Sequence, residues 1–406
     1  PYLSERQWGT VREDYSPHGD AWNYISHEMA RSKSYRWGEE GIGGFSDSKQ
    51  HICLAFSFWN HHDRALKERL FGLANRESNH GEDVKELYYY LDSTPTHSYA
   101  KMLYKYPHAA FPYDKIRRES QQRGKADSEY ELLDTGIFDK DEYFDIFIEY
   151  AKADQEDILI KVTVHNRGAN DAPLTVLPTI WFRNTWSWGY ADYNYKPILN
   201  GVANRFIEVN HRKHGKFNLY FEGVDKLLFC ENETNFKRLY GAANSSPYPK
   251  DGINDFIVSK GEKETVNLNQ IGTKAAGQYE RIIPAGGSMT FRMRLVDHTI
   301  SEPFGGFDDL FEKRIREADA FYAEIQKDVT DPDLLAIQRQ AYGGMLWNKQ
   351  FYYYNVHEWL KGDPANPKPS QQRKWGRNTG WRHLYAANLI SMPDKWEYPW
   401  FAAWDL

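Results

Sequence analysis

Three stretches of the chain combine aromatic rings with charged side chains at close spacing. They read WGTVREDYSPHGDAWNY (8–24), SYRWGEEGIGGFSD (34–47) and WEYPWFAAWDL (396–406). Rings of this kind can stack on the apolar faces of sugars, and they can equally fill a large aromatic β core. With 14 Trp, 28 Tyr and 22 Phe among 406 residues, composition alone leaves both interpretations open.

Other familiar chemical signatures are absent from the sequence. There is no GxGxxG motif after a strand, no GxxxxGK[ST] loop, no HExxH helix and no GxSxG nucleophile elbow. The adjacent His61 and His62 lack the spacing of metal ligands and indicate a loop pair. We therefore expect no cofactor and no metal site.

Composition and charge exclude several classes of partner. The formal net charge is −6, from 57 acidic and 51 basic residues, with no basic run, which argues against nucleic acid and anionic membranes. The longest apolar stretches, such as ICLAFSFW (52–59), are of strand length and too short to span a membrane. No targeting segment is visible, so we expect a cytoplasmic protein, although a chain starting at Pro1 is expected to lack its natural N-terminus. Cys53 and Cys230 lie in apolar stretches and are expected to be buried free thiols.

The first three quarters of the chain are predicted to be β structure. The segment DILIKVTVHN (157–166) alternates Ile158, Ile160, Val162 and Val164 with the residues between them, which indicates a half-buried strand. Similar strand-like runs occur at 52–59, 130–137, 143–153, 173–182, 216–223, 226–232 and 288–297. Short polar turns separate them, so residues 1–300 are predicted to form an antiparallel β-sandwich.

The pattern changes to helix near residue 305. Residues 307–326 carry apolar side chains at helical spacing, within a helical linker expected over 301–330. Asp331 and Pro332 predict the start of a second helix, which GDPANPKP (362–369) should end. A third helix is expected within 378–389, and the charged segment 113–130 is expected to be an exposed helix or loop. The helical part is thus either docked on the sandwich or truncated.

Five stretches of the chain resemble glycoside hydrolase family 63, the family of processing α-glucosidase I and its bacterial relatives. They are YRWGEEGIGGFSD (35–47), NHGEDVKELYYYLDSTPTHSY (79–99), MLWNKQFYYYNVHEWLKGDP (345–364), RNTGWRHL (377–384) and SMPDKWEYPWFAAWDL (391–406). The resemblance implies an N-terminal β-sandwich followed by an (α/α)6 barrel. Residues 331–406 would then be the first part of a catalytic barrel, truncated here, and the rest of that barrel would be their partner.

The same resemblance implies a role for Asp405. It matches the general acid of an inverting, exo-acting hydrolase, an α-glucosidase whose partner is a carbohydrate substrate. Inversion needs a second carboxylate about 6.5–9.5 Å away to activate water, and the acid needs an apolar wall that raises its pKa. Trp400, Phe401 and Trp404 could form that wall. No residue matches the family's base, including Glu358 and Glu397, so these 406 residues alone are expected to be inactive.

The resemblance also implies a set of substrate contacts, for which packing in the barrel is the alternative. They are Trp347, Gln350, Tyr353, Arg377, Asn378, Trp381, His383, Trp396, Trp400 and Trp404. For the loop residues Arg12, Glu13, Asp14, Glu82 and Asp83, packing or interdomain contacts are favoured over sugar binding. Two other functions stay open: a non-catalytic carbohydrate-binding β-sandwich protein, and a different (α/α)6 glycosidase related to trehalase or glucoamylase.

Overall fold

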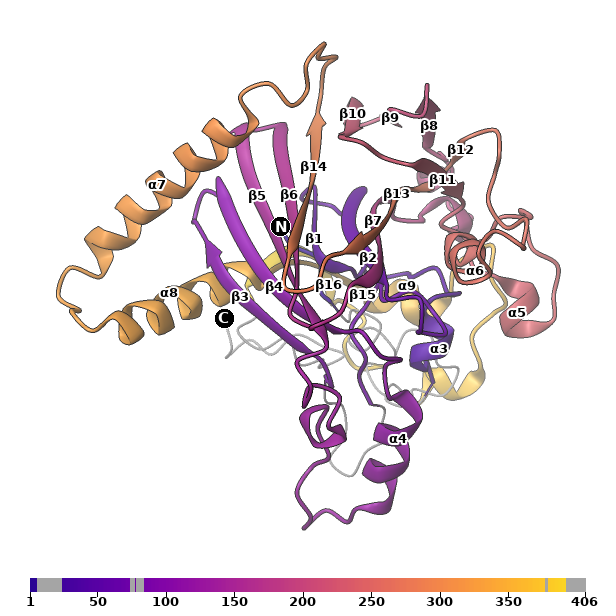
Figure 1. Cartoon of the computed structure of the whole chain (residues 1–406). Coiled ribbons are helices and arrows are strands. Elements are labelled where there is room, and N and C mark those ends of the chain that lie inside the picture. Colours follow the sequence, from indigo (N-terminus) through magenta and orange to yellow (C-terminus); the bar gives the residue numbers. More distant parts are fainter. Residues whose placement is uncertain (6–23, 74–76, 78–83, 377–378, 392–406) are drawn as a thin grey trace.

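Two antiparallel sheets form the body of the protein (Figure 1). The computed structural model describes residues 1–5, 24–73, 77, 84–376 and 379–391. The five-stranded sheet has the order β1 (Ile42–Ser46), β2 (Ile52–Trp59), β7 (Ala172–Phe182), β13 (Lys274–Ile283) and β11 (Lys226–Cys230). The nine-stranded sheet has the order β12 (Ile271–Gly272), β8 (Ile198–Val202), β9 (Phe206–His211), β10 (Gly215–Phe221), β14 (Ser288–Val296), β6 (Asp157–Asn166), β5 (Tyr143–Asp154), β4 (Tyr99–Pro107) and β3 (Leu87–Ser93).

The alternation along β6 places its side chains as the sequence predicts. Ile160, Val162 and Val164 are fully buried in a core that both sheets share. Leu159, on the opposite face, packs in a smaller apolar cluster with Phe307 and Phe311. Both faces of this part of the sheet are therefore covered, one by the second sheet and one by a helix. The prediction of large antiparallel sheets is confirmed, as is that of two buried free cysteines.

The described part of the chain also contains helices, of which α7 covers one face of the nine-stranded sheet. They are α3 (His27–Ala30), α4 (Tyr113–Gln122), α5 (Phe236–Tyr240), α6 (Gly252–Val258), α7 (Phe307–Ile325), α8 (Pro332–Trp347) and α9 (Val356–Lys361). The helix predicted at 307–326 is α7, and α4 lies in the charged segment expected to be a helix or loop. The side chain of Asp331 accepts hydrogen bonds from the N–H groups of Asp333 and Leu334, so α8 begins where predicted. In the described part of the chain, no helix is long and apolar enough to cross a bilayer.

The chain after α8 departs from the prediction of continuous helix. The helix expected to run to residue 361 ends at Trp347, and Lys349–Asn355 form β15. The segment expected to begin a helix at 378–389 contains β16 (Tyr385–Ser391), which pairs antiparallel with β15 over its whole length. The aromatic run FYYY favours a strand once a partner is available, and that partner lies thirty residues further along. Residues 331–391 contain the helices α8 and α9. That they begin an (α/α)6 barrel stays a prediction.

A third expectation, a strand at 130–137, is also wrong. Residues Leu133–Thr135 form a single 3-10 turn, followed by Gly136 at a φ of +76°. The Asp134 side chain accepts a hydrogen bond from the N–H of Glu131 at 2.7 Å, which stabilises the turn against an extended chain.

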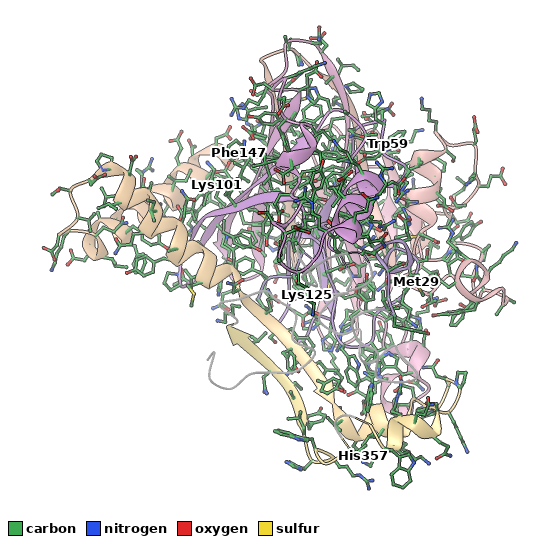
Figure 2. The ribbon with its side chains drawn as sticks, turned by 90° about the horizontal axis from the view of Figure 1, so that it is seen from below. Met29, Trp59, Lys101, Lys125, Phe147 and His357 are labelled. Atoms are coloured by element: carbon green, nitrogen blue, oxygen red, sulfur yellow. The ribbon has the colours of Figure 1, made fainter. Side chains whose placement is uncertain are left out.

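The β15–β16 ribbon is anchored to the sandwich at its start. The N–H of Tyr2 donates to the carbonyl of Lys349 at 2.9 Å, and the Tyr2 ring stacks on that of Trp347 at 4.2 Å. From there the ribbon runs to α9, where His357 is labelled in Figure 2. This arrangement brings the far end of the ribbon beside loops of the sandwich.

Candidate functional site

A groove of about 540 Å³ lies where the segment after β15 meets the sandwich loops. One part of it is lined by residues from 33–37, from 184–188 and from the region of α5. Another part is lined by residues from 358–373. Four segments distant in sequence thus contribute to one concave surface. Its lining combines aromatic rings, carboxylates and cationic side chains, as a binding site for a polar ligand requires.

Arg36 lines this groove and lies among aromatic rings. Its guanidinium carbon is 3.5 Å from the ring centroid of Trp188 and 4.2 Å from that of Trp37. The guanidinium also forms ion pairs with Glu358 and with Asp363, the latter at 3.0 Å from Nε to Oδ2. Stacking and ion pairing hold the planar group in one orientation, which presents both carboxylates at a fixed position.

Local sequence explains how the two carboxylates reach Arg36. The side chain of Asn355 caps α9 by accepting a hydrogen bond from the N–H of Glu358 at 3.2 Å. Gly362 ends the helix at a φ of +78°, and a Cβ there would lie 2.5 Å from Cδ of Pro369. Only glycine fits this position, so the turn that aims Asp363 toward Arg36 is specified by the sequence.

Glu233 supplies a third carboxylate to the groove. It accepts hydrogen bonds from Nε1 of Trp186 and Nζ of Lys196, both at 2.8 Å, and from the hydroxyl of Ser245. Burial acts to raise the pKa of Glu233, but the hydrogen bonds from Lys196, Ser245 and Trp186 outweigh it and lower the pKa below its usual value. The group is therefore an ionised hydrogen-bond acceptor near neutral pH.

Two rings of α5 give the groove an exposed apolar wall. Phe236 and Tyr240 lie one helical turn apart with centroids 5.9 Å from each other, and they are 40% and 45% exposed. Exposed rings beside hydrogen-bonding groups match the two kinds of surface on a sugar, its apolar face and its hydroxyl rim. The three carboxylates of the described lining, Glu233, Glu358 and Asp363, all have cationic partners, so the arrangement is suited to binding and orienting a ligand.

One predicted substrate contact, Tyr353, lies behind this groove. Its ring centroid is 5.2 Å from that of Trp37 and 6.4 Å from that of Trp188, and its hydroxyl is 3.4 Å from Oε2 of Glu358. The side chain is buried, so it supports the residues that line the groove.

The other predicted contacts that the structure describes lie elsewhere. Trp347 has no exposed surface, and its indole N–H donates to the carbonyl of Asp92 at 3.0 Å. Gln350 is buried beside Tyr2 at the start of the ribbon. Trp381 and His383 are exposed and stack on each other, and neither lines the groove.

The remaining predicted residues fall outside the described part of the chain. They are Asp405, Arg377, Asn378, Trp396, Trp400 and Trp404, together with the loop residues Arg12, Glu13, Asp14, Glu82 and Asp83. Their roles stay predictions.

Sequence reasoning missed most of the groove. Arg36 and Trp37 fall in a stretch that was singled out for its mixture of rings and charge, but Trp188, Glu233 and Asp363 were not noticed. The segment TWSWGYADYNY (185–195) has an aromatic density similar to that of the stretches that were noticed, and this density was the available signal.

A group of three histidines whose ring nitrogens lie close together was also missed. His51, His211 and His214 have ligand atoms that lie within 4.8 Å of one another. Only two of them are near neighbours in sequence, so no short motif announces the group.

Comparisons with known proteins give few further constraints. No family model matches the chain. The "Uncharacterized protein YMR196W" of Saccharomyces cerevisiae is 41% identical over an alignment of 451 residues, which covers 100% of this chain. The chain spans 41% of the length of that relative.

Among solved structures, a "Putative kojibiose phosphorylase from human microbiome" aligns with 84% of this chain and 39% of its own. The sequence identity is 9% and the TM-score is 0.26, values too low for the likeness to carry an argument.

Proposed function

We propose that the groove around Arg36 binds carbohydrate and that the full-length protein is a carbohydrate-active enzyme. The observation that carries the proposal is one concave surface on which the exposed rings of Phe236 and Tyr240 accompany fixed hydrogen-bonding groups. A sugar needs both surfaces at once, since its ring faces are apolar and its hydroxyls are donors and acceptors.

The finer form of the proposal is an inverting, exo-acting α-glucosidase with Asp405 as general acid. It is supported by the resemblance of residues 391–406 to glycoside hydrolase family 63. An inverting enzyme also needs a base carboxylate, which the family places downstream of the matched region. The proposed activity therefore belongs to the full-length protein, and the groove would hold part of the substrate or a second carbohydrate chain.

Binding at the groove is tested by calorimetric titration of the protein with α-linked glucose oligosaccharides. Tyr240→Ala should weaken binding by about 5–10-fold, because it removes a stacking surface worth about 1 kcal/mol. The matched control is Tyr89→Ala, which truncates a tyrosine of similar exposure on β3 and should leave the affinity unchanged. Equal affinities of the wild type and Tyr240→Ala would remove the groove from the proposal.

Catalysis is tested on the full-length protein with α-glucosides. Asp405→Asn should lower the rate of hydrolysis by about 10²–10⁴-fold, because a general acid contributes that much. Glu397→Gln, at a nearby carboxylate that matches no catalytic motif, should retain most of the activity. Unchanged hydrolysis by Asp405→Asn would overturn the assignment of the acid.

A non-catalytic carbohydrate-binding protein is the second candidate. It is favoured by the ion pairing of the three carboxylates in the described lining, which suits ligand binding more than proton transfer. Binding of oligosaccharides by the full-length protein, without turnover of any α-glucoside, would support it over the enzyme.

A further inference from the structure

Three imidazoles from different sheets meet at one edge of the sandwich. His51 immediately precedes β2 of the five-stranded sheet, whereas His211 ends β9 and His214 precedes β10 of the nine-stranded sheet. The ring centroids of each pair lie 5.0–5.1 Å apart. Their ligand atoms all lie within 4.8 Å of one another, which brings three nitrogen donors around one point.

A carboxylate lies beside the imidazoles at comparable distances. Nδ1 of His51 is 2.9 Å from Nε2 of His214, and Oδ1 of Asp47 is 3.6 Å and 3.4 Å from these two nitrogens. Around a tetrahedral metal with bonds of about 2.0–2.1 Å, ligand atoms are about 3.3 Å apart. These three separations differ from that value by a few tenths of an ångström. The ligand nitrogen of His211 lies within 4.8 Å of those of His51 and His214, so its ring has to turn toward them to complete the site.

Backbone hydrogen bonds fix the carboxylate and the turn that carries two of the histidines. Asp47 accepts hydrogen bonds from the N–H groups of Lys49 at 2.8 Å and Ile52 at 2.7 Å, within the turn that joins β1 to β2. His211 and His214 flank the turn of the β9–β10 hairpin, where the N–H of His214 donates to the carbonyl of His211 at 3.2 Å. The ligand set therefore sits on two short turns and needs little ordering before an ion binds.

The donor types also suit a metal ion. A neutral imidazole offers a metal the lone pair of one ring nitrogen, and three imidazoles meet here beside a carboxylate. The positive charges of Arg183 and Lys213 nearby oppose a bound cation, and the carboxylate of Asp47 offsets part of that repulsion. Imidazole nitrogens select transition metals such as zinc over calcium or magnesium.

Space and access are present on both sides of the cluster. A cavity of about 30 Å³ is lined by His51 and His211, and a larger one of about 280 Å³ is lined by Asp47 and His214. A site for a single ion needs no more room than that occupied by one water molecule. An ion could thus reach the ligands without opening of the sandwich.

We propose that His51, His211 and His214, with Asp47, form a binding site for a divalent transition-metal ion of the zinc class. With four protein ligands, the site would be structural, joining the β1–β2 turn of one sheet to the β9–β10 hairpin of the other. The backbone N–H of Arg183 donates to the carbonyl of His51 at 3.3 Å, and the Arg183 guanidinium lies over the rings of Trp188 and Tyr353. The ion would therefore also steady residues behind the groove, and its existence does not depend on the proposed carbohydrate function.

The test is titration of chelator-treated, full-length protein with Co²⁺ and with Zn²⁺. We expect one Co²⁺ per chain with the intense visible absorption of tetrahedral coordination, and a rise in Tm of several degrees with Zn²⁺. His214→Gln should abolish the tetrahedral spectrum and weaken Zn²⁺ binding by at least tenfold. The matched control is His298→Gln, which alters an exposed histidine paired with Asp297 at 2.8 Å and should bind Co²⁺ like the wild type.

Three results would overturn the proposal. They are no stoichiometric Co²⁺ binding, a weak spectrum typical of octahedral coordination, or equal binding by the wild type and His214→Gln. If His214→Gln does not fold, as judged by circular dichroism, His51→Gln takes its place. Anomalous diffraction at the zinc edge from wild-type crystals grown with Zn²⁺ tests the site without any variant. The proposal requires a zinc peak among the three imidazoles.

Discussion

The two ends of β15 carry aromatic stacks that look alike in sequence and differ in their surroundings. At the start of the strand, Trp347 is sealed between the rings of Tyr2 and Tyr90, with centroids 4.2 Å and 5.2 Å away. Near its end, Tyr353 packs against rings that hold the charged Arg36 at the edge of an open groove. Both residues are predicted substrate contacts, yet Trp347 has no exposed surface, whereas the residues packed around Tyr353 line the groove.

The difference lies in where the polar groups of each stack are placed. The indole N–H of Trp347 donates to the backbone carbonyl of Asp92, so this polar atom is already used inside the fold. The Arg36 stack includes two carboxylates on α9 and the turn that follows it. Of these two aromatic clusters, the one around Trp347 belongs to the core, and the one around Arg36 lines a groove together with charged groups.

The largest effect that tests this contrast is a loss of stability on substitution of Trp347, at the start of β15. Trp347→Ala should lower the free energy of unfolding by about 3–5 kcal/mol, because it leaves a large cavity in the core and an unpaired carbonyl at Asp92. Urea denaturation measures the loss, and calorimetry on the folded variant should give an unchanged affinity for oligosaccharide. Near-normal stability with lost sugar binding would instead favour Trp347 as a substrate contact.

The sequence could predict those elements whose stabilising contacts lie within one segment of the chain. The strand β6 and the helix α7 were recognisable because their apolar periods of two and 3.6 residues repeat within one segment. The strand β15 was mistaken for helix, since nothing between Trp347 and Asn355 breaks a helix locally. Its extended state depends on pairing with β16 and on the contact of Lys349 with Tyr2, which joins opposite ends of the chain.

The candidate site was predictable to the same extent, in its local features only. Aromatic density pointed to Arg36 and Trp37, and it was equally available for Trp188. The meeting of these residues with Glu358 and Asp363 could not be predicted, because four distant loops form the groove and no local pattern records which loops meet. The histidine cluster has the same origin, with His51 and His211 brought together from opposite sheets.

Near the end of β15, where Arg36 lines the groove, we expect a substitution to lower stability less than Trp347→Ala does and to weaken oligosaccharide binding more. Arg36→Met keeps a stem that can cover the Trp37 and Trp188 rings but leaves Glu358 and Asp363 without their cation. We expect a loss of about 1–3 kcal/mol in the free energy of unfolding, because both carboxylates can rehydrate from the groove. Oligosaccharide affinity should fall tenfold or more, since a charged donor is lost and its two acceptors are released.

Arg339 provides the matched control for this prediction, because it makes the same kinds of contact at a place away from the groove. Its guanidinium lies 4.7 Å from the Tyr322 ring centroid and forms ion pairs with Asp92 and Asp319. Arg339→Met should therefore cost a similar amount of stability and leave oligosaccharide binding unchanged. If both variants lost binding equally, the loss would reflect general loosening of the fold, and the contrast between the two ends of β15 would fail. A selective loss in Arg36→Met would assign recognition to the charge between the rings.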